Sequence, residues 1–146
     1  MRIAIGSDHA GFSLKEVLGR YLEDLGYDVL DQGCFSLKSV DYPEYAAKVG
    51  VVVGSGEAEF GVLVCGTGIG ISIAANKVKG IRAALCHNSY EAEMARRHND
   101  ANVLCMGSRT LGEGVALHTL KHFLDTRFEG DRHSRRVKQI SAIEKA

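Results

Sequence analysis

The stretch at residues 61–77, GVLVCGTGIGISIAANK, decides the fold of this chain. It opens on a short apolar run over residues 61–65, which is typical of a strand buried on both faces of a parallel sheet. Three alternate glycines follow within residues 66–70 and lead into a helix expected over residues 71–77. A buried strand that turns through glycines into a helix is a building unit of α/β proteins. The stretch therefore predicts a parallel sheet covered by helices.

Apolar runs and amphipathic stretches alternate over the rest of the chain in the same way. Further strands are expected over residues 2–6, 28–30, 81–86 and 101–106, and further helices over residues 13–25, 41–53, 89–97, 111–124 and within a basic segment at 127–146. Ser13 with Glu16, and Thr110 with Glu113, have capping-box spacing and predict two of the helix starts. Residues 1–146 are thus predicted to form a single α/β domain. We expect a three-layer α/β/α sandwich around a roughly five-stranded parallel sheet, of the Rossmann-like or flavodoxin-like class.

The bulk composition argues against several classes of partner. Eighteen basic and eighteen acidic residues cancel, so there is no overall attraction to nucleic acid or to a membrane surface. No apolar segment approaches the ~20 residues that a membrane-spanning helix needs. The four cysteines show no C-x-x-C spacing, and the first residues, MRIAIGSDH, have the pattern of a strand and not of a secretion signal. We therefore expect reduced thiols in a cytoplasmic protein.

Ligands of parallel sheets bind beyond the carboxyl ends of the strands, near the point where the strand order reverses. This rule directs attention to the loop at Ser7, Asp8 and His9 after the first strand, and to residues 65–70 after the third. If the strand order is the common 2-1-3-4-5, these two loops are neighbours. Asp8 and His9 could then act as an acid–base pair on a sugar or a phosphate, or serve only as a helix-capping carboxylate beside a surface histidine.

The loop after the third strand carries the strongest chemical signal. Its glycines, Gly66, Gly68 and Gly70, let several backbone N–H groups face one point, which favours a negatively charged oxygen there. The same field is expected to lower the pKa of Cys65 and to prepare its thiolate as a base or a nucleophile. The residues alone leave equally open that Cys65 is a small buried hydrophobe and that the glycines merely turn the chain.

Known motifs that share features with this loop do not fit it. A phosphate-binding P-loop requires G-x-x-x-x-G-K-[ST], which is absent, and a dinucleotide fingerprint would have to follow the first strand. A cysteine phosphatase would carry an arginine six residues after the nucleophile, where this chain has Ile71. H-E-x-x-H, a Cys/His quartet and a carboxylate cluster with ligand spacing are also missing, so no metal site is predicted.

Two sets of polar residues outside these loops remain as candidates. His98 comes just before the fifth strand, at the amino end of the sheet, and is therefore either structural or part of the active site of a neighbouring molecule. Arg132 and Arg136 are four residues apart on one helical face, where they could bind a phosphate or merely form a solvated basic surface. The basic run has no interleaved aromatic residues, which disfavours nucleic-acid binding.

Taken together, these motifs resemble the B-type ribose-5-phosphate isomerase family, which also includes galactose-6-phosphate isomerase subunits. The resemblance spans essentially the whole chain. The motifs that carry it are GSDHAG at residues 6–11, DYP at 41–43, CGTGIGISIAANK at 65–77, GIRA at 80–83, HNDAN at 98–102 and GSR at 107–109. The ribose-type branch is favoured because His98, Asn99 and Asp100 are intact and the base position holds Cys65, whereas some members of the family use a glutamate as base.

The resemblance implies the interconversion of ribose 5-phosphate and ribulose 5-phosphate, a proton transfer through an enediolate that needs no cofactor. It implies that Cys65 takes the C2 proton with Thr67 close by, and that His98 opens the sugar ring with the help of Asp8. The residues that would contact the substrate are Asp8, His9, Gly66, Thr67, Gly68, Ile69, Gly70, Asn99, Arg109, Arg132 and Arg136.

The resemblance also implies a homodimer with shared active sites, in which His98 reaches the site of the partner. Pairing of dimers into tetramers stays open. The basic segment 127–146 is expected to contribute to phosphate binding and to dimer packing.

Other functions are weighed against this one. The nearest keeps the chemistry but takes a hexose 6-phosphate, such as allose or galactose 6-phosphate. A non-catalytic sugar-phosphate-binding module is disfavoured, because binding alone would not need Cys65, Thr67 and His98 together. A thiol redox protein is disfavoured because no resolving cysteine lies near Cys65 in the sequence.

Overall fold

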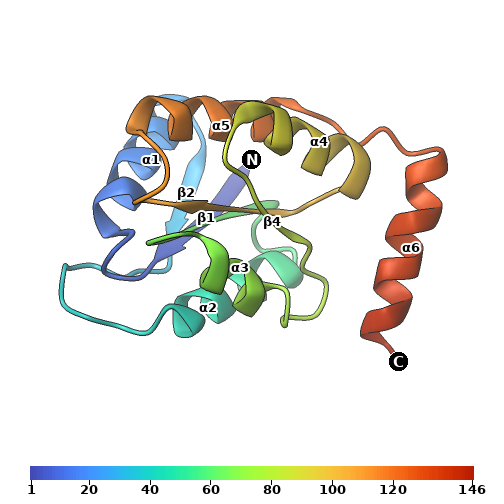
Figure 1. The fold of residues 1–146 in the computed structure, drawn as a ribbon, viewed down its shortest axis with the longest axis horizontal. Coiled ribbons are helices and arrows are strands. Elements are labelled where there is room, and N and C mark those ends of the chain that lie inside the picture. Colours follow the sequence, from blue (N-terminus) through green and yellow to red (C-terminus); the bar gives the residue numbers. More distant parts are fainter.

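The computed structural model describes all 146 residues. In chain order the elements are β1 (Arg2–Ser7), α1 (Phe12–Asp24), β2 (Asp28–Asp31), α2 (Tyr42–Gly54), β3 (Phe60–Cys65), α3 (Ile69–Ala75), β4 (Ala83–Leu85), α4 (Ser89–Asn99), β5 (Val103–Gly107), α5 (Glu113–Asp125) and α6 (Arg132–Glu144). Helices α1, α4 and α5 cover one face of the sheet, and α2 and α3 cover the other (Figure 1). The predicted α/β/α fold class is confirmed.

The five strands are all parallel and are ordered β2-β1-β3-β5-β4. The expected order 2-1-3-4-5 is wrong, because β5 lies beside β3 and β4 takes the edge. Burial agrees with this order: all five residues of β5 are buried, whereas the three residues of β4 are only partly buried. The longer strand occupies the interior, and the three-residue strand lies at the edge. The strand order still reverses between β1 and β3, where the loops of interest begin.

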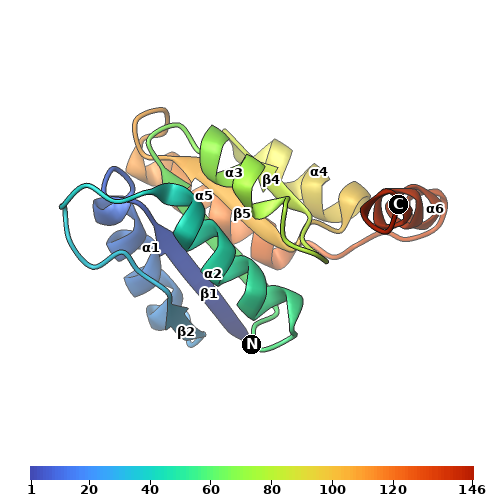
Figure 2. The same cartoon turned by 90° about the horizontal axis from the view of Figure 1, so that it is seen from below.

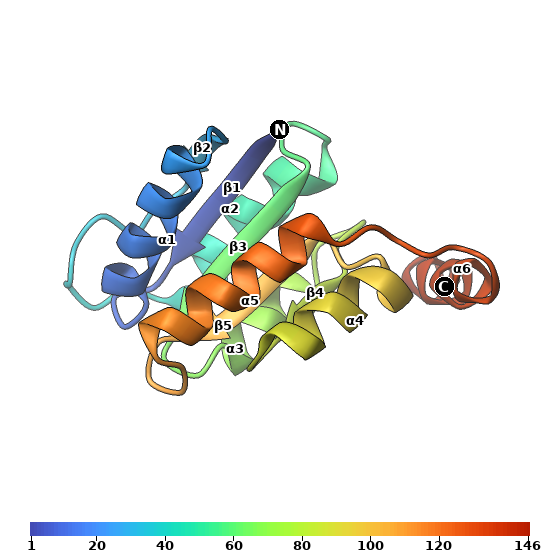
Figure 3. The same ribbon diagram turned by 90° about the horizontal axis from the view of Figure 1, so that it is seen from above.

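Alternation along β3 decides which way the side chain of Cys65 faces. Val62 and Val64 pack in the core beneath α1, α4 and α5, whereas Leu63 and Cys65 pack with buried residues of α2 and α3. The two layers are seen separately from below and from above the sheet (Figures 2 and 3). Cys65 therefore lies at the end of β3 on the α2–α3 side.

Both predicted capping boxes are absent. Helix α1 begins one residue before Ser13, because the carboxylate of Asp8 accepts a hydrogen bond from the amide of Gly11 at 2.9 Å and fixes the chain just before the helix. Helix α5 begins three residues after Thr110, whose hydroxyl donates to the carbonyl of Gly107 at 3.2 Å. In both places a side chain that closes the preceding loop sets the helix start.

Helix α6 stands apart from the sandwich, beyond the end of α4 (Figures 1 and 2). His133 is its only buried residue, whereas Ile140 and Ile143 are exposed. A hollow of about 540 Å³ lies between α6 and the β4 side of the body, with Arg82 and Ala83 on one wall and these two isoleucines on the other. The terminal helix expected in the basic segment is confirmed. None of the helices has the length and apolar character needed to cross a bilayer.

Candidate active site

The loops after β1, β3 and β5 meet at the carboxyl edge of the sheet. The amide of Asp8 donates a hydrogen bond to the carbonyl of Val64 at 3.3 Å, which ties the loop after β1 to the end of β3. On the other side of β3, the amide of Arg109 donates to the carbonyl of Gly66 at 2.9 Å. The predicted neighbourhood of the first two loops is confirmed, because β1 and β3 stay adjacent whatever the order of β4 and β5.

The sulfur of Cys65 is held by the loop that follows it. Cys65 is 4% exposed, and the amide of Gly68 donates to its Sγ at 3.1 Å. Thr67, which was expected close to the sulfur and in contact with the substrate, uses its Oγ1 to accept a hydrogen bond from the amide of Ile69 at 3.2 Å. The hydroxyl proton of Thr67 therefore remains available to a bound molecule.

Three amides of this loop have no acceptor within the chain. The amides of Gly68 and Ile69 are used inside the loop, but those of Gly66, Thr67 and Gly70 donate no hydrogen bond to backbone or side chain. Backbone donors left free at the end of a parallel strand are suited to an anionic oxygen of a ligand. The loop thus offers donors as well as the buried sulfur.

The backbone at Gly68 requires glycine. Its φ is +77°, and a Cβ there would lie 2.8 Å from the carbonyl carbon of Met106. This left-handed turn directs the Gly68 amide back to the sulfur of Cys65. The sequence pattern of alternate glycines indicated a tight turn, and the structure gives the reason at this position.

Tyr42 belongs to the site, although sequence reasoning did not single it out. It is the first residue of α2, and its Oη lies 2.7 Å from the position that a Cβ at Gly70 would take. The only signal in the sequence was its place in the DYP motif at residues 41–43. Arg109, which was predicted, packs in the same way against Gly66, with its Nη1 3.1 Å from the corresponding Cβ position. Both polar groups therefore border the glycine loop.

Asp8 and His9 each have one polar atom engaged and one left free. The Oδ1 of Asp8 accepts a hydrogen bond from the amide of Gly11 just before α1. This contact agrees with the alternative that Asp8 serves at the start of the helix. The Nδ1 of His9 accepts from the amide of Val40 at 3.1 Å. With Nδ1 accepting, the proton of the neutral ring lies on Nε2, which can donate to an oxygen of a ligand.

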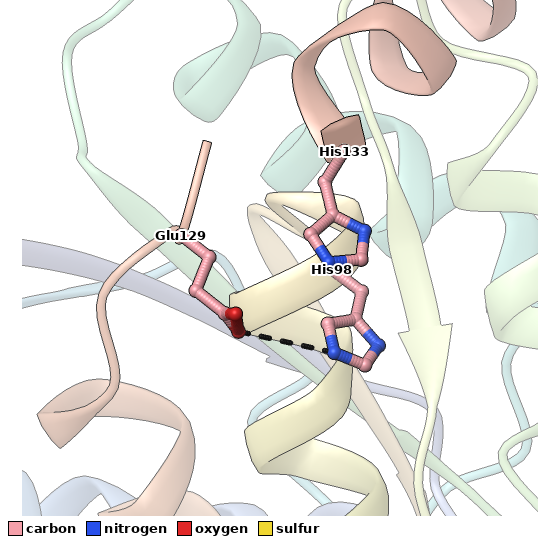
Figure 4. Close-up of side chains that lie close together, drawn as sticks. All are labelled: His98, Glu129 and His133. Atoms are coloured by element: carbon pink, nitrogen blue, oxygen red, sulfur yellow. Dashed lines mark ion pairs between the residues drawn. The ribbon is translucent and has the colours of Figure 1, made fainter. Parts of the chain in front are cut away.

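A second cluster joins α4, the segment before α6, and α6 itself (Figure 4). The rings of His98 and His133 are stacked, with centroids 4.2 Å apart and planes 14° apart. The Oε2 of Glu129 lies 3.9 Å from the Nε2 of His98. The Nε2 of His133 is buried and has no hydrogen-bond partner. The predicted residues Asn99, Arg132 and Arg136 border the same cluster and are exposed.

Possible ligand atoms of His98, Glu129 and His133 lie within 4.8 Å of one another. The lone pair of an imidazole nitrogen lies in the plane of its ring, and these two planes are nearly parallel. A metal ion would require the two lone pairs to meet at a common point. Here they run side by side and do not meet.

The structure separates the predicted site residues into two groups. Cys65 ends β3 at the carboxyl edge, together with Asp8, His9 and Arg109. His98 lies in the last turn of α4, which leads into the amino end of β5, and strands β3 and β5 run parallel. The length of a strand, about 16 Å for five residues, therefore separates the two groups. One chain does not bring His98 to Cys65.

Charges around the second cluster shift two pKa values. A hydrogen bond from the Nε of Arg97, at 2.9 Å, holds the pKa of Glu129 below its ordinary value of 4.5. Burial lowers the pKa of His133 from its ordinary value of 6.5, and the neighbouring charges of His98 and Arg132 lower it further. At neutral pH the cluster therefore contains a charged Glu129 and an uncharged His133.

The lowered pKa of His133 predicts a loss of stability in mild acid. Below pH 6.5 the unfolded chain takes up a proton at this residue more readily than the folded chain, so the free energy of unfolding falls as the pH drops through this window. We expect His133→Gln to make this fall less steep, whatever its effect at pH 7.5. Urea unfolding from pH 7.5 to 5.0 measures the slope, with the exposed His87→Gln as control. Equal slopes in wild type and His133→Gln would contradict the assignment.

Comparison with known proteins extends these observations over the whole chain. Residues 3–140 match the model of the family described as Ribose/Galactose Isomerase. Ribose-5-phosphate isomerase B of Escherichia coli (strain K12) is 48% identical over 143 residues, which cover 98% of this chain and 96% of that protein. The structure of Clostridium thermocellum ribose-5-phosphate isomerase B superimposes with a TM-score of 0.99 at 52% identity, covering 99% of this chain and 98% of the other.

A second solved structure agrees. Type B ribose 5-phosphate isomerase of Trypanosoma cruzi gives a TM-score of 0.96 at 49% identity and covers 99% of both chains. The family resemblance seen in the motifs is thus confirmed in sequence and in fold. This chain belongs to the ribose/galactose isomerase family and is an isomerase.

Proposed function

We propose that this enzyme interconverts ribose 5-phosphate and ribulose 5-phosphate, with Cys65 as the base that moves the proton. The observation that carries the proposal is the sulfur of Cys65, which the Gly68 amide holds at 3.1 Å where the loops after β1, β3 and β5 meet. The relatives named ribose-5-phosphate isomerase B support the choice of substrate.

The reaction is a proton transfer between neighbouring carbons. Cys65 removes the proton from C2 of the open-chain aldose, the electron pair of that bond forms the enediolate, and the same thiol returns the proton to C1. The enediolate oxygen needs donors already in place. The free amides of Gly66, Thr67 and Gly70 and the hydroxyl proton of Thr67 fit this role, whereas the amides of Gly68 and Ile69 are already in use. No cofactor takes part in this route.

The remaining predicted residues divide between ring opening and binding. His98 is the acid and base that opens the ring, and Asp8, with one carboxylate oxygen free, assists it. The Nε2 proton of His9 and the exposed guanidinium groups of Arg109, Arg132 and Arg136 hold the phosphate, and Asn99 contacts the sugar. Arginine is suited to this task because its planar fork makes paired hydrogen bonds to phosphate oxygens.

These roles require two chains. His98 lies at the amino ends of the parallel strands, whereas Cys65 lies at their carboxyl ends. We therefore propose a homodimer in which His98, Asn99, Arg132 and Arg136 of the partner subunit complete the site around Cys65. The exposed Ile140 and Ile143 beside the 540 Å³ hollow give segment 127–146 an apolar surface for dimer packing.

A cytoplasmic location is part of the same proposal. All four cysteines are free and buried, as expected of a protein kept in reducing surroundings.

Turnover of defined sugar phosphates tests the proposed substrate. Ketose formation is measured with ribose 5-phosphate, allose 6-phosphate and galactose 6-phosphate, in buffer with a chelator and without added metal. We expect kcat/KM for ribose 5-phosphate to exceed the others by at least about 10-fold, since one additional carbon unit changes discrimination by that much. A preference for a hexose 6-phosphate would overturn the pentose assignment, and the absence of any turnover would favour a binding module.

A further inference from the structure

Two histidines of α5 that take no part in the proposed chemistry lie together on its outer face. His118 and His122 are one helical turn apart, and their Nε2 atoms are 2.8 Å apart. Their rings meet edge to face, with centroids 4.5 Å apart and planes 72° apart. The opposite face of α5 is the buried one, formed by Ala116, Thr119, Leu120, Phe123 and Leu124. The pair is therefore presented to solvent by a helix that is firmly packed underneath.

We propose that His118 and His122 form a chelating site for a divalent copper or nickel ion. At 2.8 Å the neutral rings share one proton between two nitrogens, so one lone pair is already aimed at the other ring. A metal ion that replaces the shared proton is bound by both nitrogens once the two rings turn about their side-chain bonds, without a change in the backbone. Imidazole nitrogen suits copper, nickel and zinc, and a four-residue spacing lets one helix supply both ligands.

The separation of the two nitrogens already suits an ion that binds its ligands near 90°. With metal–nitrogen bonds of about 2.05 Å, a 2.8 Å separation gives an angle of about 86° at the metal, whereas a tetrahedral angle would need a separation of ~3.3 Å. An angle near 90° is the one that square-planar and octahedral Cu²⁺ and Ni²⁺ prefer, while Zn²⁺ prefers tetrahedral sites. We therefore expect affinity in the order copper, nickel, zinc.

The surroundings of the pair tolerate a cation. His118 and His122 lie in the last two turns of α5, where the carbonyl end of the helix favours positive charge. Lys121, which precedes His122 in the sequence, is paired with Asp125 at 2.7 Å, so its repulsion is largely offset. The hydroxyl of Thr126 donates to the carbonyl of His122 at 2.6 Å and steadies this end of the helix. The remaining coordination positions open to solvent and can be filled by water.

The site is independent of the proposed catalytic centre. Helix α5 packs on one face of the sheet, and Cys65 belongs to the buried cluster of the other face. Occupancy of the α5 pair is therefore expected to leave turnover of the sugar phosphate unchanged, and failure of the proposed function would not affect the metal site.

Calorimetric titration of the intact protein with NiCl₂, and then with CuCl₂ and ZnCl₂, tests the proposal. We expect one ion per chain, and we expect His118→Ala and His122→Ala each to weaken nickel binding by at least about 10-fold, since loss of even an outer partner of a metal site costs that much. The electron paramagnetic resonance spectrum of the copper complex is expected to show two equivalent nitrogen ligands. Alanine favours helix, so both variants should keep α5.

Matched variants separate this site from the other places where a metal could bind. His87→Ala removes a different exposed histidine, and His98→Ala removes a member of the stacked cluster. We expect both to bind nickel as wild type does. Undiminished binding by the His118→Ala/His122→Ala double variant, loss of binding in His98→Ala, or an affinity for zinc above that for copper would each overturn the proposal.

Discussion

Replacing Cys65 by alanine is expected to lower kcat for ribose 5-phosphate by about 10²–10⁴-fold, the range that a positioned base contributes. The Gly68 amide that binds the sulfur would be left pointing at a void. Cys86 and Cys105 cannot replace Cys65. Burial raises the pKa of Cys86 to about 12 and that of Cys105 well above its ordinary value, so both stay protonated thiols.

Cys105→Ala is the matched control for this experiment. Cys105 is a buried cysteine on the adjacent strand β5, paired in register with Leu63, and it packs in the same cluster as Cys65. Each substitution removes one buried sulfur, so their effects on thermal unfolding should be similar. We expect activity to be kept in Cys105→Ala and lost in Cys65→Ala. Comparable loss in both would point to packing, and full activity in Cys65→Ala would rule out the thiol base.

Mixing two inactive variants should restore activity if the active site is shared. In a dimer of one Cys65→Ala chain and one His98→Ala chain, one site carries both substitutions and the other carries neither. Random exchange places half of the dimers in this mixed form, so about one quarter of wild-type activity is expected. The physical reason is the separation of His98 from Cys65 by the length of a strand within one chain.

Subunit exchange has to be demonstrated for the mixture to be informative. Tagging the two variants differently and isolating the mixed dimer establishes it, and the two unmixed variants give the baseline. Activity of the isolated mixed dimer should be about half that of wild type, since one of its two sites is intact. An isolated mixed dimer as inactive as its parents would show that each chain must supply both residues to its own site.

Much of the fold could be predicted from the sequence because its signals are local. The apolar run of β3, the alternate glycines and the amphipathic helices each follow from neighbouring residues. The order of β4 and β5 does not, since it depends on which of two strands far apart in sequence is better suited to lie beside β3. The capping boxes failed for a similar reason: Asp8 and Thr110 close loops whose geometry the spacing alone does not reveal.

The same difference between local and distant signals applies to the candidate site. The loop that holds Cys65 was predictable, because strand, glycines and thiol are contiguous in the sequence. Tyr42 was missed because it reaches Gly70 across the α2–α3 interface, and no periodic pattern links the two positions. Glu129 and His133 were not singled out as partners of His98, because the stack is formed by a helix that folds back from the far end of the chain.

The exchanged order of β4 and β5 also sets the sequence of events during synthesis. β4 has a single neighbour in the sheet, and that neighbour is β5. As the chain leaves the ribosome, β1, β2 and β3 can pair as soon as they emerge, but β4 and the helix after it have no template until residue 107 follows. Until β5 emerges, the newly made chain therefore has an unpaired side on β3 and an unpaired β4. β5 then pairs with both strands.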